Sequence, residues 1–397
     1  MTTMRFASGI SDQVSAASAA DDACGQVLEQ LAGAPCHAAF VFISPIYRAS
    51  WDALLASLHQ RLRPHVLIGC SGSGIIGGGR ELEWVPAISI VAAHLPDVRL
   101  FPFLVTPEEL ERSSPGGFWV DKIGASPEAQ PFFVLFADPF TCDPEKLLQE
   151  LNHTYRGRPI VGGLISGGKH PGDHLIFMET TVVPEGAAGL AMTGDITMDA
   201  AVSQGCRPIG RPYIVTKAED HVVWHLGGRQ ALGVLHEVLS RLPRDDRELA
   251  QRGSVFAGLA INEMRATFTP GDFLIRNIVG IDPASGAMAI SDRAEVGQTL
   301  QFHLLDAATS REELRRLLVQ RGGAPELPPP AGCLVFNCTG RGKSLYGSSH
   351  HDVRTIHTVS GKVPTGGCFC NGEIGPVGGT NFLHGYTASI GLFRPRT

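Results

Sequence analysis

A strand–helix–strand unit that ends in glycine occurs three times in this chain, and no other feature constrains its fold as strongly. Each unit has a short apolar run, a segment of helical period and a second apolar run. The separation from a phenylalanine late in the first run to a following glycine is 27 residues for Phe42, 26 for Phe136 and 30 for Phe336. Short continuous apolar runs are typical of buried parallel strands. The sequence therefore predicts a degenerate internal repeat of a βαβ-like unit.

This repeat also predicts where a ligand would bind. The two strands of a βαβ unit are parallel, so their carboxyl ends lie at one edge of the sheet, where ligands bind in open α/β sheets. The first strands end at Ser44-Pro45, Asp138-Pro139 and Asn337-Cys338, and the second strands lead into glycine-rich segments. We expect these segments to converge as loops around a ligand. Candidate contacts there are Cys70, Ser71, Gly162 and Gly163.

The segments between the three units contain short β-branched runs separated by turn residues, which predicts antiparallel or mixed sheet. We therefore expect an α/β fold, a mixed-sheet layered sandwich with a four-layer αββα arrangement as the preferred version. The expected domains are an N-terminal helical extension over 1–36, one domain over 37–210 and a second over 211–397. Residues 323–332, rich in proline and glycine, are the best candidate for a linker.

The C-terminal stretch from Cys368 to Thr387 has glycine at 372, 375, 378, 379 and 385. Five glycines allow close backbone approach, which suits a loop around a ligand. A long hairpin with a bulge would use the same residues. Asn371, Gly372, Glu373, Asn381, His384 and Tyr386 are the candidate ligand contacts of this stretch, and each could instead hold the protein's own backbone or core.

Several segments resemble the FIST family, named for F-box and intracellular signal transduction proteins. They are Asn371–Pro376, Asn381–Thr387, Leu334–Gly342, Val202–Gly210, Gly271–Asn277 and Val161–Leu164. The resemblance covers most of the chain, from about Phe40 to Phe393, and both halves of the family. It implies a cytosolic sensory or ligand-binding module. Some FIST-type proteins are described as haem-binding nitric-oxide sensors, so haem is a possible cofactor, and the sequence leaves the cofactor unknown.

Cys338 is the sharpest candidate for reactivity, because it ends a predicted strand and is followed by Thr-Gly-Arg-Gly. The cation of Arg341 could favour its thiolate, although a cysteine at a strand end is more often a small buried residue. Arg341, between Gly340 and Gly342, could clamp a carboxylate or phosphate, or it could hold a buried acid or loop carbonyls. The candidate ligand contacts of this segment are Cys338, Gly340, Arg341 and Gly342.

The amino-acid composition limits the kinds of partner that we expect for this protein. The net charge of −6 argues against nucleic acid. Nine cysteines, an odd number, indicate a reducing compartment, and no apolar run reaches the roughly 20 residues of a membrane span. We therefore expect a soluble cytoplasmic protein with no membrane partner. Cys368-x-Cys370 lacks the spacing of a structural zinc site, and we expect no metal.

The sequence thus predicts an intracellular sensor that binds a small ligand, with an amino acid among the candidates, and signals to a separate partner protein. One alternative is a haem-dependent gas sensor, for which His174, His221, His225 and His384 are equally eligible as axial ligand. A less favoured alternative is an enzyme with Cys338 as nucleophile and His350, His351 or His384 as base.

Overall fold

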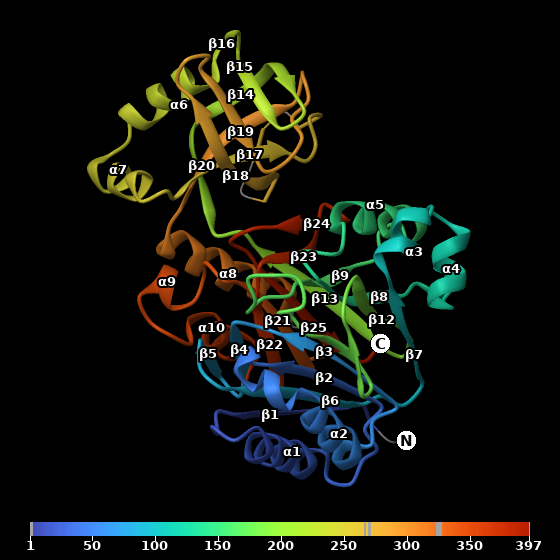
Figure 1. Ribbon diagram of the computed structural model, residues 1–397. Coiled ribbons are helices and arrows are strands. Elements are labelled where there is room, and N and C mark those ends of the chain that lie inside the picture. Colours follow the sequence, from blue (N-terminus) through green and yellow to red (C-terminus); the bar gives the residue numbers. More distant parts are fainter. Residues whose placement is uncertain (1–2, 266, 269–270, 323–327, 397) are drawn as a thin grey trace. The chain divides into compact units, whose positions relative to one another are not determined.

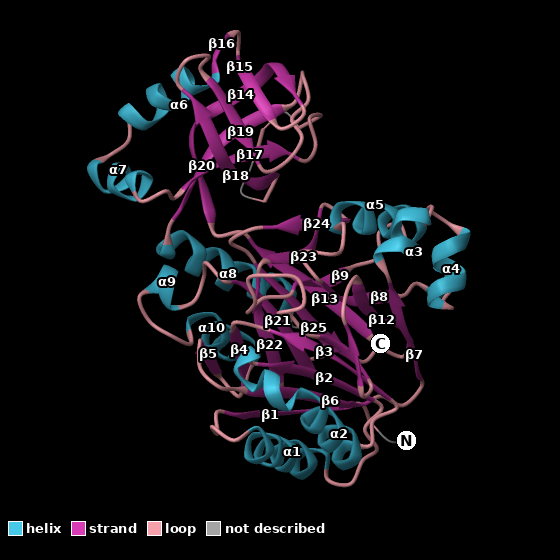
Figure 2. Ribbon diagram, in the orientation of Figure 1, coloured by secondary structure: helices cyan, strands magenta, loops and turns pink. Residues whose placement is uncertain are grey.

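The computed structural model describes residues 3–265, 267–268, 271–322 and 328–396. The chain forms two compact units (Figure 1). Unit 1 contains the residues up to Ser203 and those from Leu314, and unit 2 contains Gln204–Glu313. This division differs from the expected one, because unit 2 begins near the expected boundary at 210 but ends at 313, and residues 1–36 are part of unit 1. Both units mix helices with strands, as the α/β prediction states (Figure 2).

Unit 1 contains the three predicted parallel strand pairs, which confirms the internal repeat. Their register aligns Phe42 with Cys70, Phe136 with Gly163 and Phe336 with Cys368. The pairs are β2 (Ala38–Ile43) with β3 (Val66–Ser71), β8 (Phe132–Ala137) with β9 (Ile160–Leu164), and β21 (Gly332–Cys338) with β22 (Thr365–Cys370). We call the segments around them repeat 1 (5–94), repeat 2 (98–194) and repeat 3 (197–203 with 314–394).

Each pair lies in the middle of a six-stranded sheet, and the three sheets have the same order. Two antiparallel strands flank each first strand, and a hairpin flanks each second strand. The flanking strands are β6 (Ile88–His94) and β1 (Arg5–Ser11), β12 (Ala187–Gly194) and β7 (Val98–Val105), and β25 (Ala388–Arg394) and β13 (Thr197–Ser203). Unit 1 therefore has three sheets where a four-layer sandwich would have two.

Helices connect the strands within each repeat. Repeat 1 has α1 (Ala16–Leu31), η1 (Pro45–Ser50) and α2 (Trp51–Leu62), and repeat 2 has α3 (Pro107–Arg112), α4 (Gly117–Ile123), η2 (Pro127–Ala129) and α5 (Pro144–Thr154). Repeat 3 has α9 (Lys343–Tyr346) and α10 (His351–Ser360), and α8 (Ala307–Gly322) leads into it. The N-terminal helical extension expected over 1–36 contains α1, while the edge strand β1 before this helix was not expected.

The hairpin of each repeat pairs with the sheet of another repeat. Repeat 1 supplies β4 (Gly74–Gly77) and β5 (Arg80–Glu83) to β22, repeat 2 supplies β10 (Ile176–Met178) and β11 (Thr181–Val183) to β3, and repeat 3 supplies β23 (Gly372–Val377) and β24 (Thr380–His384) to β9. We call these the exchanged hairpins. The C-terminal stretch is thus a hairpin, the second of the two alternatives. Gly378 and Gly379, both with positive φ, form its turn.

The three repeats meet at three phenylalanine rings. The ring centroids of Phe42, Phe136 and Phe336 are 5.9, 5.9 and 5.8 Å apart, an almost equilateral triangle. All three rings are fully buried in one apolar cluster that draws residues from all three sheets. The triangle marks a pseudo-threefold axis through the core of unit 1, with equivalent residues of the repeats around it.

Many glycines expected in loops lie in strands instead, because neighbouring strands approach them too closely for a side chain. A Cβ on Gly162 would lie 1.8 Å from the carbonyl oxygen of Leu135, and a Cβ on Gly367 would lie 1.8 Å from that of Val335. Both glycines have φ values above +150°, outside the range that side-chain-bearing residues favour. The glycine-rich pattern therefore reports close strand packing at these two equivalent positions.

Unit 2 is an antiparallel sheet that closes on itself, because β14 pairs with both β20 and β15. Its strands are β14 (Cys206–Glu219), β15 (Val222–Leu226), β16 (Arg229–Gln230), β17 (Val255–Ala260), β18 (Phe273–Asp282), β19 (Ala287–Ile290) and β20 (Thr299–Leu305), with helices α6 (Ala231–Ser240) and α7 (Arg244–Gln251). Arg207 forms ion pairs with Asp246 and Asp306 at 2.5 and 2.8 Å. In sequence, unit 2 is an insertion into repeat 3.

Candidate functional site

The register of the repeats brings polar side chains to equivalent places at the carboxyl ends of the parallel strands. Two positions beyond the axial phenylalanines stand Ser44, Asp138 and Cys338, and side chains two apart on a strand face the same side. In the exchanged hairpins, Ile75, Ile176 and Glu373 pair with equivalent residues of their neighbouring strands. We call the buried group Ser73, Asp138, Ser166, His174, Cys338 and Glu373 the axial polar layer.

Asp138 and His174 form one pair of this layer. Oδ1 of Asp138 accepts hydrogen bonds from the backbone N–H of Phe140 (2.8 Å) and of Thr141 (3.1 Å). Oδ2 lies 3.4 Å from Nδ1 of His174, whose side chain is fully buried. Burial alone would raise the pKa of Asp138, but His174 and these N–H donors outweigh it, so the pKa is lowered. Asp138 is therefore ionised and orients the imidazole.

His174 has hydrogen-bonding capacity that the described protein residues do not use. Neither ring nitrogen makes a hydrogen bond within the part of the chain that the structure describes. The ring of Phe140 stacks on the imidazole, with centroids 5.3 Å apart and planes 14° apart. With Nδ1–H directed at the Asp138 carboxylate, Nε2 of the neutral imidazole is an acceptor.

Cys338 and Glu373 form the second pair, at the equivalent place in repeat 3. Glu373 is fully buried, and its Oε2 accepts a hydrogen bond of 3.1 Å from the backbone N–H of Thr387. Burial raises the pKa of Glu373 well above its usual range, and the backbone N–H and Arg341 offset this only in part. Burial also raises the pKa of Cys338 to about 12. Burial therefore favours the protonated form of both groups.

Two serines link the sheets beside these pairs. The backbone N–H of Ser73 donates to Oγ of Ser166 at 2.9 Å, and Oγ of Ser166 donates to the carbonyl oxygen of Phe369 at 2.5 Å. Their hydroxyl oxygens are 3.2 Å apart. Ser71 accepts from the N–H of Leu175, next to His174. These contacts join residues from all three repeats beside the two pairs.

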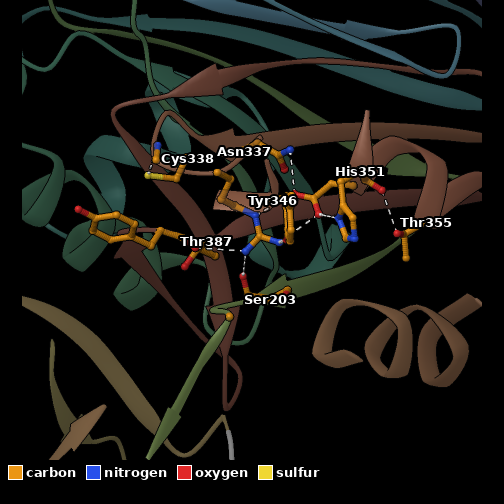
Figure 3. A network of polar contacts seen from close by, with 12 residues as sticks. Ser203, Asn337, Cys338, Tyr346, His351, Thr355 and Thr387 are labelled. Atoms are coloured by element: carbon orange, nitrogen blue, oxygen red, sulfur yellow. Dashed lines mark hydrogen bonds and ion pairs between the residues drawn. The ribbon is translucent and has the colours of Figure 1, made fainter. Parts of the chain in front are cut away.

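A buried ion pair fixes the segment that follows Cys338 (Figure 3). Nε and Nη2 of Arg341 bind the two carboxylate oxygens of Asp352 at 2.8 and 3.2 Å, and both side chains are fully buried. Nη2 also donates to the Tyr346 hydroxyl, and Nη1 donates to the carbonyl oxygens of Ser203 and Tyr386. All five N–H groups of Arg341 thus bind protein atoms, as in the alternative in which the arginine holds a buried acid.

Asp352 stays ionised in this network. Burial alone would raise the pKa of Asp352, but the Arg341 charge and the hydrogen bonds from His351 and Arg341 lower it. Glu81 lies beside Asp352, and its Oε1 accepts a 2.8 Å hydrogen bond from the backbone N–H of Val353 near the start of α10. Burial and then repulsion by Asp352 raise the pKa of Glu81 to about 7. Arg341 is therefore neutralised by Asp352 with a second buried carboxyl nearby.

The other candidate contacts fall in two groups. Near the axis, Sγ of Cys368 lies 3.8 Å from Sγ of Cys70 and 3.8 Å from Sγ of Cys370, and a Cβ on Gly163 would meet the Cys370 sulfur at 2.7 Å. The Tyr386 ring covers Gly340, where a Cβ would lie 2.7 Å from the ring.

The remaining candidates of the C-terminal stretch bind the protein's own backbone. Asn371 donates to the carbonyl oxygen of Ile165, and the ring of His384 lies 3.0 Å from the carbonyl oxygen of Gly375. Oδ1 of Asn381 accepts from the N–H of Ile160, the first residue of β9, so Asn381 lies at the opposite end of this strand from the polar layer. Gly162, Gly342 and Gly372 are buried backbone positions around these contacts.

Sequence reasoning did not include Asp138, Ser73, Ser166 or His174 among the ligand contacts. A signal for them was present in the spacing. Ile75 follows Cys70 by five positions and Glu373 follows Cys368 by five, whereas Ile176 follows the equivalent Gly163 by thirteen. The longer connection in repeat 2 contains His174 and brings it to Asp138.

Three aromatic residues lie around the outer side of the layer. Trp84 and Tyr386 are equivalent positions after the exchanged hairpins, and both have left-handed backbone conformations with φ of 58° and 57°. Such conformations cost about 1–3 kcal/mol for residues other than glycine, and they cluster at functional sites. Trp84 is 71% exposed and Phe140 is 45% exposed. The polar layer therefore has aromatic surface beside it.

Metal and haem find little support in the described residues. No group of three or more His, Cys, Asp or Glu side chains there is placed to hold a metal ion. The ring of His384 lies 3.0 Å from the carbonyl oxygen of Gly375, His221 is exposed, and His225 is half-buried in unit 2. These observations do not favour His221, His225 or His384 as a haem ligand, and the His174 imidazole lies against the Asp138 carboxylate. No helix of the described chain is long and apolar enough to cross a membrane.

Comparison with known proteins agrees with the resemblance seen in the sequence. The FIST N domain model matches residues 37–229, and the FIST C domain model matches residues 231–376, so their boundary falls inside unit 2. An uncharacterized protein present in two Mycobacterium tuberculosis strains is 38% identical over 395 residues, which is 98% of this chain and all of the relative. An uncharacterized Mycobacterium bovis protein is 35% identical over 394 residues, 98% of this chain and 99% of the relative.

A solved structure, "Cyanuric acid hydrolase: evolutionary innovation by structural concatenation", aligns over 98% of this chain and all of its own, with a TM-score of 0.34 and 10% identity. The fold and site define a three-repeat α/β protein with a buried polar layer on its pseudo-threefold axis. The chain belongs to the FIST family, whose domains are associated with sensing in signal transduction and with ligand binding.

Proposed function

We propose that this protein is an intracellular sensory module that binds a small ligand at the axial polar layer and signals to a separate partner protein. The ligand class to test first is the amino acids, because an acid such as Glu373 can bind an amino group. The candidate contacts are the polar layer itself together with Cys70, Ser71, Gly340 and Tyr386 around it.

The observation that carries this proposal is buried hydrogen-bonding capacity without protein partners, at His174 in repeat 2 and at Glu373 in repeat 3. Nε2 of His174 and Oε1 of Glu373 make no hydrogen bond to another described residue. A buried polar group without a partner costs about 1–3 kcal/mol, so such groups call for an explanation. A ligand with matching donors and acceptors would remove the cost of burying these unpartnered groups. The site would therefore bind such a ligand in preference to compounds without those groups.

Ligand binding could be transmitted through the segment after Cys338. This segment contacts the polar layer at Cys338 and the Arg341–Asp352 pair a few residues later. A ligand that bound one arrangement of the segment better than another would shift the population between them. A partner protein that reads the position of α9 or α10 would then receive the signal.

The cysteine-enzyme alternative is less favoured. A thiol whose pKa is raised to about 12 is almost wholly protonated at neutral pH, and the thiolate is the nucleophile. The group beside Cys338 is the Glu373 carboxyl, while His350 accepts from the N–H of Glu81 and His351 contacts Asp352. These contacts favour Cys338 as part of a neutral binding surface.

A thermal-shift screen with the twenty L-amino acids and common amines tests the proposal, together with native mass spectrometry and an absorption spectrum of the fresh protein. We expect at least one compound to stabilise the protein by mass action. His174→Gln should abolish this shift, whereas His170→Gln, an exposed histidine of the same connection, should preserve it. A retained shift in His174→Gln, or no shift with any compound, would contradict the proposal.

A further inference from the structure

The axial polar layer is unusual in the balance of its charges. It contains two acids, Asp138 after the first strand of repeat 2 and Glu373 in the exchanged hairpin of repeat 3, and both are at least 97% buried. The cation that faces Glu373 is Arg341, and its five N–H groups all bind protein atoms, with the Asp352 carboxylate taking two of them. Its positive charge is therefore already balanced.

Other charged groups lie at the outer side of this region. The Arg48 guanidinium binds the Asp173 carboxylate at 2.8 Å, with its side chain 55% exposed, and Lys169 is exposed. The groups that face Glu373 from neighbouring strands are the thiols of Cys338, Cys368 and Cys370. A ligand that entered the layer would therefore meet an ionised Asp138, a neutral acid, neutral thiols and an imidazole acceptor.

We propose that the ligand of this layer is an organic cation, a compound with an ammonium or amidinium group and without a carboxylate, held between Asp138–His174 and Glu373. This inference rests on the proposed function, because it names the ligand of the same site. A carboxylate or phosphate in the layer would lie beside Asp138, and the described residues of the layer include no cation to offset the repulsion. An ammonium group supplies N–H donors, which Nε2 of His174 and Oε1 of Glu373 can accept.

Binding of such a cation is linked to proton release. Glu373 binds a proton in the free protein because its charged form is poorly solvated. A positive group at hydrogen-bond distance favours the charged form, so the carboxyl proton leaves for solvent as the cation binds. Cation binding should therefore release protons to the buffer. The Asp138 and Glu373 carboxylates would then both face the charge of the bound ligand.

The test compares amino acids with the amines that differ from them only by the carboxylate. The probes are putrescine with ornithine, agmatine with arginine and histamine with histidine, titrated into the full-length protein by calorimetry in two buffers of different ionisation enthalpy. We expect the amine of at least one pair to bind roughly tenfold tighter or more than its amino acid, with measurable proton release.

Three variants show which residues are responsible for amine binding and for proton release. Glu373→Gln keeps an acceptor for the Thr387 N–H, and it should weaken the amine at least tenfold and abolish proton release. Asp138→Asn should weaken the amine and keep the proton release. Glu81→Gln changes a buried carboxyl outside the layer and is the matched control, which should bind like the unaltered protein. Circular dichroism confirms that each variant is folded.

The outcomes separate the two proposals. Tighter binding of an amino acid than of its amine overturns the cation inference and leaves the proposed sensory site intact. Amine binding without proton release, or proton release retained in Glu373→Gln, also overturns it. Failure of every amine and amino acid to bind overturns both. The comparison within pairs uses the unaltered protein, so it does not depend on how the variants fold.

Discussion

Repeat 1 and repeats 2 and 3 share one scaffold but differ at the carboxyl edge. Repeat 1 has Ser44 after its first strand and Ile75 in its hairpin, where repeat 3 has Cys338 and Glu373. Repeat 2 has Asp138, which its longer connection pairs with a histidine. The phenylalanine rings beneath are almost equally spaced in spite of these differences. The buried acids and the buried imidazole therefore stand where the repeats have diverged.

Equivalence of the three repeats can be tested first at the phenylalanine triangle. Phe42→Ala, Phe136→Ala and Phe336→Ala should each cost about 4 kcal/mol of unfolding free energy, because each leaves a cavity in a fully buried contact. Urea denaturation followed by tryptophan fluorescence measures the loss. Three losses within about 1 kcal/mol of one another would support the pseudo-threefold core. A single dominant phenylalanine would contradict it.

The Arg341–Asp352 pair belongs to repeat 3 alone and should be the next largest effect. Arg341→Met leaves the Asp352 carboxylate buried without its counter-ion, which costs about 3 kcal/mol or more. The matched control in repeat 1 is Arg48→Met, whose exposed ion pair with Asp173 should contribute less than about 1 kcal/mol. Urea denaturation measures the free energy of unfolding of both variants. Comparable losses would contradict the conclusion that this network fixes the segment after Cys338.

Glu81 of repeat 1 should make the folding stability of the protein depend on pH. Its pKa is raised from the usual 4.5 to about 7 in the folded protein, so folding favours the protonated form. The contribution to stability is therefore present below about pH 4.5 and is lost as pH rises to 7, an amount of roughly 3 kcal/mol at most.

Glu81→Gln should flatten this slope between pH 4.5 and 7, as measured by denaturation midpoints at several pH values. Asp352, whose pKa is lowered, contributes a slope of opposite sign, but that slope lies below about pH 4 and does not overlap. An unchanged slope in Glu81→Gln would show that another group titrates in this range.

The smallest effect concerns the glycine that replaces cysteine in repeat 2. A Cβ on Gly163 would lie 2.6 Å from the carbonyl oxygen of Gly372, so Gly163→Ala should cost about 1–3 kcal/mol. Gly25→Ala lies in α1 with nothing within 4 Å of its new methyl group and should stabilise by about 0.5–1 kcal/mol. Thermal unfolding of both variants measures the difference, and a stabilised Gly163→Ala would mean that β23 can move away.

Local sequence pattern was sufficient for the elements of each repeat and insufficient for their assembly. Apolar runs around Phe42, Phe136 and Phe336 predicted the parallel pairs correctly. The exchanged hairpins were not predicted, because pairing between distant strands leaves no periodicity in either strand. Gly162 and Gly367 were interpreted as loops, since composition alone does not distinguish a turn from a close strand contact.

The candidate site was predicted in the same partial way. The edge of the sheet, Cys338 and Glu373 follow from where strands end and where a charged residue stands among glycines. The pairing of Asp138 with His174 was missed because it depends on a connection of unusual length and on the fold of another repeat's sheet. Arg341 was recognised as special, but its partner Asp352 is on α10, and an ion pair between a loop and a helix has no sequence spacing.

The exchanged hairpins have a consequence for the protein as it leaves the ribosome. The hairpin β4–β5 pairs with β22. Gly77 can therefore pair with Gly366 only after the ribosome has synthesised almost the whole chain. Until then, the strand β4, which contains Ile75 and Ile76, has no sheet edge of its own chain to join. Apolar strands with an unpaired edge are prone to pair with strands of other chains, which leads to aggregation. The first repeat to be made is therefore completed only when synthesis is nearly over, and a chain shortened by its last two strand pairs would lose structure at both of its ends.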